Sequence, residues 1–291
     1  MTDRSTAVGN DAGSLRDARA ELERQPSSNV DDAETTLPEL FGGRYALTRE
    51  IGRGGMARER FLREIEIAAR LRHPHIVPRY DSGDAAGVLF FIMPFAEGPS
   101  LRARIAEGLL AIAEVVPLLR DIAGALHFAH EHGVVHRDIK PDNVMLSGGA
   151  AVVADFGIAK AVRVAQGSGA TAGLTQTGTG IGTPAHMAPE QAIGDPSTDH
   201  RADIYSFGCL AYELLPGKPP FQGQSAHQII AAHMSAVPVS VASIRSDSPP
   251  AIAALVMRCL EKDPTDRPQS SADVVTMLEG AVGLAMYEPN A

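Results

Sequence analysis

The stretch His-Arg-Asp-Ile-Lys-Pro-Asp-Asn at residues 136–143 decides how the rest of the chain is interpreted. It follows an amphipathic run over residues 115–132 and precedes a short apolar run that ends in Asp-Phe-Gly at residues 155–157. The aspartate can accept a proton from a hydroxyl group. The lysine two residues on is a cation, and the asparagine five residues on offers a neutral oxygen ligand to a hard metal ion. This spacing predicts a catalytic loop.

The same residues, with Asp155 and an Ala-Pro-Glu triplet at 188–190, occur in the order of the protein-kinase signature. Over about residues 44–281 the chain resembles the bacterial, eukaryotic-like protein serine/threonine kinases. The resemblance implies an α+β, two-lobed protein-kinase fold with a truncated small β lobe and an intact, mainly helical large lobe. It also implies ATP and Mg²⁺ as cofactors, and transfer of the γ-phosphate to Ser and Thr hydroxyls of protein substrates.

The resemblance assigns a role to each polar residue of the loop. Asp138 would be the base that accepts the substrate hydroxyl's proton, and Lys140 would steady the transferring phosphoryl group. Asn143 and Asp155 would hold the magnesium ions that bridge the phosphates. A lysine at position 140 matches serine/threonine kinases and differs from tyrosine kinases.

The apolar run at residues 88–95 predicts a buried strand that leads into a hinge. By resemblance Met93 is the gatekeeper beside the adenine, Pro94 offers its carbonyl group and Ala96 offers its N–H group. Proline is tolerated at position 94 because only its carbonyl is needed. Met145 matches the apolar floor beneath the adenine.

A glycine-rich stretch near residue 51 follows a predicted strand that starts near Arg44. Glycines let backbone N–H groups approach phosphates closely, because no side chain holds the backbone away. By resemblance the nucleotide-binding positions of this loop are Ile51, Gly52, Gly54 and Gly55.

The pattern then departs from the family. Residues 60–72 predict an amphipathic helix, in which the resemblance makes Glu64 the glutamate that pairs with a lysine. Kinases place two strands before this helix, the second with that lysine, and two strands need roughly 20 residues. Only residues 58–60 lie between the glycine-rich stretch and the helix, and the first 139 residues contain no lysine. The arginines nearby could bind phosphate instead or be plain surface charges: Arg53, Arg58 and Arg60.

The segment from Val164 to Pro189 contains no Asp, Glu, Lys or Arg and is rich in Gly and Thr, which predicts a mobile loop. Thr175 and Thr177 resemble the autophosphorylated pair of bacterial kinases, and Arg137 would bind the added phosphate. Thr183 matches the position that contacts the catalytic aspartate. A flexible linker without phosphorylation is the alternative.

Three further residues match structural positions of the large lobe. Glu190 would form an ion pair with Arg267, and Asp203 would brace the backbone of the catalytic loop. We expect four segments: a disordered leader at 1–43, the reduced small lobe at 44–96, the large lobe at 97–281 and a tail at 282–291.

Composition limits the partners. A net charge of -9 argues against nucleic acid as a partner, and no run of about 18 apolar residues predicts a membrane span.

Cys209 and Cys259 lie in apolar runs, which predicts buried, reduced thiols and a cytoplasmic protein. At residues 73–77 we expect a turn at Pro74 that ends the helix and begins a strand near Ile76. The histidines at 73 and 75, and those at 127–136, have no further ligands nearby. A turn and a helix end are therefore better interpretations of these histidines than metal sites. Self-association for autophosphorylation remains open.

Two alternatives to an active protein kinase follow from the sequence. Loss of a charge-assisted phosphate contact costs a few kcal/mol, so weak or no turnover is expected and a catalytically inactive kinase-like scaffold is the main alternative. A small-molecule phosphotransferase of the antibiotic-kinase type shares a related Asp and Asn pair. The Ala-Pro-Glu triplet, Arg267 and the Thr-rich segment disfavour it.

Overall fold

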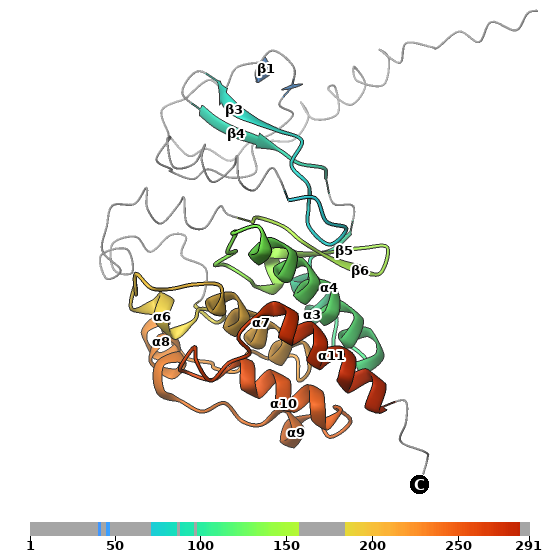
Figure 1. The fold of residues 1–291 in the computed structure, drawn as a ribbon, viewed down its shortest axis with the longest axis vertical. Helices are drawn as coiled ribbons and strands as arrows, with labels where there is room; N and C mark the ends of the chain where they lie inside the picture. The colour runs from blue at the N-terminus through green and yellow to red at the C-terminus, as the bar shows by residue number, and fades with distance from the viewer. Residues whose placement is uncertain are drawn as a thin grey trace, which may run out of the picture. The chain divides into compact units, whose positions relative to one another are not determined.

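The computed structural model describes residues 40–41, 45–46, 71–85, 88–95, 98–156 and 184–285 (Figure 1). They belong to one unit of the chain, Leu40–Ala291. The glycine-rich stretch, the predicted helix up to residue 70 and residues 157–183, which include most of the predicted mobile loop, lie outside the described residues. Leu71 and Arg72, the last two residues of that predicted helix, are not helical, since the chain turns here toward Pro74.

The described strands form three antiparallel pairs. They are β1 (Leu40–Phe41) with β2 (Tyr45–Ala46), β3 (Asp81–Ala85) with β4 (Val88–Ile92), and β5 (Val144–Ser147) with β6 (Ala150–Val153). The last pair is a two-residue hairpin, because Ser147 faces Ala150 across Gly148 and Gly149. Both glycines have positive φ, at 59° and 86°, which is the conformation that the tightest hairpin turns require.

Most of the regular structure in the described chain is helical, and these helices form the large lobe. They are α3 (Leu101–Ala106), α4 (Ile112–Glu131), α6 (Pro189–Ala192), α7 (Arg201–Leu214), α8 (Ala226–Ser235), α9 (Val241–Ile244), α10 (Pro250–Cys259) and α11 (Ser271–Ala285). A 3₁₀ turn, η1, covers Pro141–Asn143. The helix predicted at 115–132 is α4. Helix α11 is described as far as Ala285.

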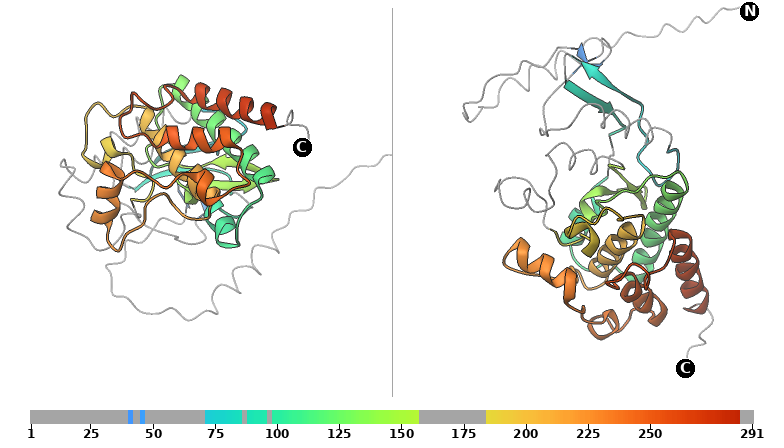
Figure 2. Two further views of the ribbon diagram at one scale, coloured as in Figure 1. Left: turned by 90° about the horizontal axis from the view of Figure 1, so that it is seen from below. Right: turned by 60° about the vertical axis from the view of Figure 1, so that its left-hand side comes forward.

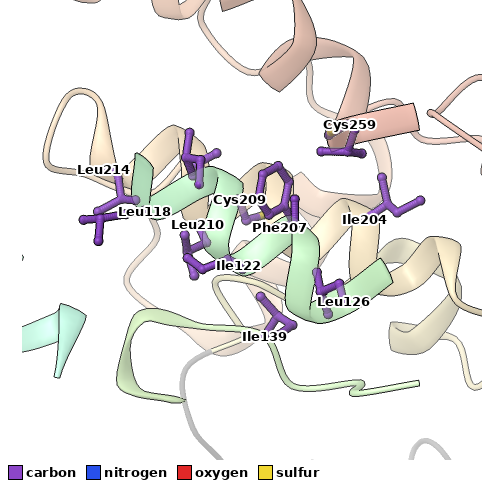
Figure 3. Close-up of a cluster of buried hydrophobic side chains, with 14 of the residues drawn as sticks. Leu118, Ile122, Leu126, Ile139, Ile204, Phe207, Cys209, Leu210, Leu214 and Cys259 are labelled. Carbon is purple, nitrogen blue, oxygen red and sulfur yellow. The ribbon is translucent and has the colours of Figure 1, made fainter. Parts of the chain in front are cut away.

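The core of the large lobe is built around α7. Every residue of α7 from Ala202 to Leu214 is buried, as expected of a helix that is largely apolar all round. Figure 3 shows Leu118, Ile122 and Leu126 of α4 beside the side chains of α7, with Cys259 of α10 nearby. Both cysteines are buried free thiols, as the sequence predicted.

The helices α7 and α10 approach closely at Gly208. A Cβ atom at this position would lie 2.7 Å from the Cβ of Cys259, so only glycine fits there without movement. Figure 2 shows α10 and α11 on the side of the lobe that leads to the C-terminus. Among the described residues, none of the helices combines the length and the apolar composition that crossing a membrane requires.

Two expectations about the strands are wrong at their ends. The strand predicted over 88–95 stops at Ile92, and Phe95 is 89% exposed instead of buried. Pro94 has no N–H group with which to continue the ladder. The strand expected from Ile76 is only an isolated bridge between Ile76 and Val153, since prolines at 74 and 78 flank it. The turn expected at Pro74 is present, where the N–H of Ile76 donates to the carbonyl of His73 (3.1 Å).

Candidate active site

The structure brings Asp138, Lys140 and Asn143 together. The Nζ of Lys140 donates to Oδ2 of Asp138 at 2.8 Å, and Nδ2 of Asn143 donates to the same oxygen at 3.1 Å. The Asn143 amide also donates to the carbonyl of Asp138 at 2.8 Å. The turn η1 makes this possible, because it curls the chain so that residues five apart in sequence meet. Since the side chain of Asp138 is 46% exposed, it is accessible to a substrate.

The hairpin of β5 and β6 brings Asp155 close to Asn143. Val144 pairs with Val153, so the residues just outside the hairpin are neighbours, and the N–H of Ala154 donates to the carbonyl of Asn143 at 2.8 Å. Asp155 has a positive φ of 62°. A non-glycine residue in this conformation costs free energy, and such residues concentrate at functional sites.

His136 connects the segment that carries Asp138 to the segment that carries Asp155. Its Nε2 donates to the carbonyl of Ala154 at 2.8 Å, while Nδ1 accepts from the N–H of Asp138 at 3.3 Å. Its ring packs edge-on against Phe156 with the centroids 4.6 Å apart. The side chain is fully buried, so the backbone segments that carry Asp138 and Asp155 are held at a fixed separation.

Asp203 holds the backbone of the catalytic loop by accepting hydrogen bonds from it. One carboxylate oxygen accepts from the N–H of His136 (2.7 Å) and the other from the N–H of Arg137 (2.6 Å), whose φ of 68° aligns the two groups. Asp203 is the residue to which the resemblance assigned this brace. Burial by itself would raise its pKa, but hydrogen bonds from His130 and the loop N–H groups outweigh burial, so the pKa of Asp203 is lowered.

His130 of α4 is a site residue that the sequence analysis did not identify. Its Nε2 donates to Asp203 at 2.9 Å, and its Nδ1 accepts from the hydroxyl of Ser271 at 3.1 Å. It therefore connects the start of α11 to the brace of the catalytic loop. Its position in the last turn of a predicted amphipathic helix was visible in the sequence, but its partners were not.

The polar groups of this site fit a divalent cation. Asn143 uses its amide N–H groups on Asp138, and its Oδ1 accepts no hydrogen bond from any described residue. Together with the carboxylate of Asp155 it supplies hard oxygen ligands, which suit Mg²⁺ better than a softer metal. These two residues would hold the ion.

The hinge segment approaches β5. Ser100 forms an antiparallel bridge with Met145, and the N–H of Leu146 donates to the carbonyl of Pro99 at 2.9 Å. A Cβ atom at Gly98 would lie 1.5 Å from the carbonyl oxygen of Leu146, so only glycine permits this approach. Met145 is half-buried below the hinge, and Met93 is 41% exposed.

A buried ion pair joins two distant parts of the large lobe. Arg267 donates to both carboxylate oxygens of Glu190, at 2.6 and 2.9 Å, and is fully buried. This is the pair expected from the resemblance. Next to it, Gln191 accepts from the N–H of Ala188 and donates to the carbonyl of Arg137, both at 3.1 Å. The segment after residue 184 is thereby attached to the catalytic loop.

A second ionic cluster, centred on the buried carboxylate of Glu213, was not predicted. Glu213 of α7 accepts from Arg102 at 2.5 Å and from Nε2 of His186 at 2.9 Å, and Arg102 also donates to Asp142 at 3.3 Å. Burial alone would raise the pKa of Glu213, but the hydrogen bonds from His186 and Arg102 lower it. An acid among apolar residues near the end of a helix was the signal that could have pointed to it.

Several predicted site residues lie outside the described part of the chain. They are Ile51, Gly52, Gly54, Gly55, Glu64, Ala96, Thr175, Thr177 and Thr183.

Comparison with known proteins agrees with this geometry. The protein kinase domain family matches residues 48–277. The chain is 36% identical over 285 residues to the serine/threonine-protein kinase PknD of Mycobacterium tuberculosis, covering 97% of this chain and 42% of PknD. It is 37% identical over 255 residues to PknH of Mycobacterium bovis, covering 87% of this chain and 41% of PknH. The chain thus spans less than half the length of these relatives.

A solved structure shows the same fold. The kinase domain of PknI from Mycobacterium tuberculosis superposes with a TM-score of 0.59 at 29% identity, covering 77% of this chain and 79% of that domain. The described helices and the small two-stranded sheets correspond to a mainly helical large lobe and a truncated small lobe. The chain belongs to the protein kinase family, within the bacterial, eukaryotic-like serine/threonine kinases.

Proposed function

We propose that this chain binds Mg²⁺-ATP and transfers the γ-phosphate to Ser and Thr hydroxyls of proteins, at a low rate, with Asp138 as the base. The observation that carries the proposal is the convergence of Lys140 and Asn143 on one oxygen of Asp138, beside Asp155. The family uses ATP and magnesium in general. Protein phosphorylation by this particular chain is our inference.

The two oxygens of Asp138 have different tasks in this mechanism. Oδ2 is occupied by Lys140 and Asn143, whereas Oδ1 accepts no hydrogen bond from any described residue. A substrate hydroxyl can therefore donate to Oδ1, which orients the hydroxyl oxygen and takes its proton as the phosphoryl group is transferred. Lys140, beside the same carboxylate, supplies positive charge to the transferring group. Mg²⁺, when held by Asn143 and Asp155, neutralises charge on the phosphates.

The adenine would lie between the hinge and Met145. The half-buried side chain of Met145 offers an apolar surface, and Pro94 has a carbonyl group and no N–H group, so it can only accept. By the family resemblance Met93 would border this space as the gatekeeper, and the N–H group of Ala96 would make the second hinge contact. The sequence of the glycine-rich stretch supports a phosphate-binding role for Ile51, Gly52, Gly54 and Gly55.

We also propose that Thr175 and Thr177 are autophosphorylated and that Arg137 binds the product. The Nε of Arg137 is buried and has no hydrogen-bond partner among the described residues. A buried guanidinium N–H without a partner is costly, and a phosphate oxygen would satisfy it. Autophosphorylation between two copies would require transient self-association, and Thr183 would then contact Asp138.

The absent lysine limits the rate. In the family a lysine on the missing strand pairs with the glutamate that Glu64 matches, and without that cation the phosphates would lose one charge-assisted contact, which costs a few kcal/mol. The same gap favours a second candidate function, a kinase-like scaffold without turnover. Free buried thiols fit a reducing compartment, so we place either function in the cytoplasm.

The test is the intact mass of the purified chain after incubation with Mg²⁺-ATP, beside an Asp138→Asn variant. We expect added phosphate on the parent, mapped to Thr175 or Thr177, and none on the variant. A folded parent that gains no mass and phosphorylates no Ser/Thr peptide would leave the scaffold as the better assignment. Equal phosphate on parent and variant would remove Asp138 from the mechanism.

A further inference from the structure

The segment before β3 runs beside the end of β6 in parallel register. Ile76 bridges Val153, the N–H of Val77 donates to the carbonyl of Val153, and the N–H of Val153 donates to the carbonyl of His75, both at 2.9 Å. Arg79 follows Ile76 by three positions and Phe156 follows Val153 by three positions, so both residues come shortly after this bridge. This arrangement brings Arg79 near Phe156.

The side chain of Arg79 confirms this placement. Its Nη2 donates to the carbonyl of Phe156, directly after Asp155. The charge of Asp155 also acts on the guanidinium: burial lowers the pKa of Arg79, and the neighbouring carboxylate partly opposes that shift. A guanidinium remains protonated at neutral pH in spite of such a shift. A fixed positive charge therefore lies beside the carboxylate that we assign to the metal.

Three other described cations lie in or near the catalytic loop: Lys140, Arg102 and Arg137, the last of which we assign to phosphate on Thr175 or Thr177. Lys140 is held by Asp138 at 2.8 Å, on the side where the substrate hydroxyl would bind. Arg102 is held by Glu213 and Asp142. Arg79 reaches the neighbourhood of Asp155 from the segment that precedes β3, whereas Lys140 reaches Asp138 from within the catalytic loop.

We propose that Arg79 is a nucleotide-binding residue whose guanidinium contacts the phosphates of the nucleotide held at Asn143 and Asp155. It would make the contact that is lost with the lysine of the missing strand, since a planar guanidinium binds phosphate oxygens in pairs. The proposal rests on the proposed function, because it requires a nucleotide at this site. It explains how a chain with no lysine in its first 139 residues retains a positive charge there.

The experiment measures the affinity of the purified chain for ATP, ADP and adenosine by calorimetry in the presence of Mg²⁺. Arg79→Met removes the charge and keeps the length of the side chain, and Arg79→Lys keeps the charge without the planar fork. We expect Arg79→Met to weaken ATP binding by about tenfold or more, as for loss of a hydrogen bond to a charged group. The affinity for adenosine should not change. The ATP affinity of Arg79→Lys should lie between those of the parent and of Arg79→Met.

The matched control is Arg258→Gln on the exposed face of α10, which removes the same charge far from the loop and should leave all three affinities unchanged. Thermal melting shows whether each variant is folded. If Arg79→Met binds ATP as well as the parent, or loses ATP and adenosine affinity in equal measure, Arg79 has no phosphate contact and the proposal is wrong, while the proposed function stands. A parent that binds no Mg²⁺-ATP overturns both.

Discussion

The catalytic loop and the hinge are attached to the large lobe in different ways. The loop is held by side chains from distant segments: Asp203 accepts from its backbone, and Gln191 donates to it. The hinge is held mostly by backbone hydrogen bonds, such as that between Leu146 and Pro99, and it exposes Phe95. Hydrogen bonds from distant side chains hold the catalytic residues, whereas the position of the hinge depends on close contact between two backbone segments.

This difference has an energetic consequence. Buried charges that are paired and hydrogen-bonded are costly to disrupt, because removing one partner leaves the other uncompensated. Exposed side chains can be changed with little effect. Substitutions on the catalytic side should therefore destabilise the whole lobe, while those at the hinge should act locally, on nucleotide binding.

The largest effect should come from breaking the Glu190–Arg267 pair. Arg267→Ala leaves a buried carboxylate without its two hydrogen bonds, which should lower the free energy of unfolding by about 3–5 kcal/mol. Urea denaturation followed by circular dichroism measures this loss. The control is Arg258→Ala on the surface of α10, and a similar small change in both variants would contradict the role of the pair.

The free energy of unfolding should depend on pH because of His233 in α8. Its Nδ1 accepts from the hydroxyl of Tyr205 at 2.9 Å, its Nε2 is buried without a partner among the described residues, and burial lowers its pKa to about 4. Lys262 and His186 lower it further. The unfolded chain binds this proton more tightly, so stability is full above pH 6.5 and is lost as the pH falls toward 4.

Between pH 6.5 and 4 the free energy of unfolding of the parent should fall by on the order of 3 kcal/mol because of this histidine alone. His233→Gln, which does not titrate, should lack that component. Urea midpoints at pH 7, 5.5 and 4 for both proteins provide the measurement. Parallel curves for the two proteins would show that His233 is already protonated in the folded state.

A third prediction addresses the hinge. Gly98→Ala places a methyl group against the carbonyl of Leu146, and overpacking of this kind costs roughly 1–3 kcal/mol. Because the hinge must move away from β5, we expect ATP affinity to fall as well. Gly108→Ala is a useful control, since its Cβ would contact nothing within 4 Å, although its φ of 132° adds a backbone cost. Unchanged ATP binding in Gly98→Ala would show that the hinge tolerates displacement.

The smallest effect should come from Phe95. Because its side chain is 89% exposed, Phe95→Ser should change the free energy of unfolding by less than about 0.5 kcal/mol. The same chemical denaturation assay measures it. A loss above 1 kcal/mol would mean that Phe95 is covered in solution, and the contrast between hinge and catalytic loop would then be smaller than described.

The sequence by itself predicted the parts of the site that depend on short spacing. Asp138, Lys140 and Asn143 meet because one turn spans them, and Asp155 joins them because a two-residue hairpin closes the segment between. The long helix before the loop followed from its apolar period. The Glu190–Arg267 pair was predicted only through the family resemblance, since 77 positions separate its members.

Only the tertiary structure decided which distant side chains meet. His130 reaches Asp203 across 73 positions, Arg102 reaches Glu213 across 111, and Arg79 reaches Phe156 across 77. Each residue alone has the pattern of an ordinary surface or core position. Hydrogen bonds between such residues depend on how helices and strands pack, which the local periodicity of a sequence does not encode.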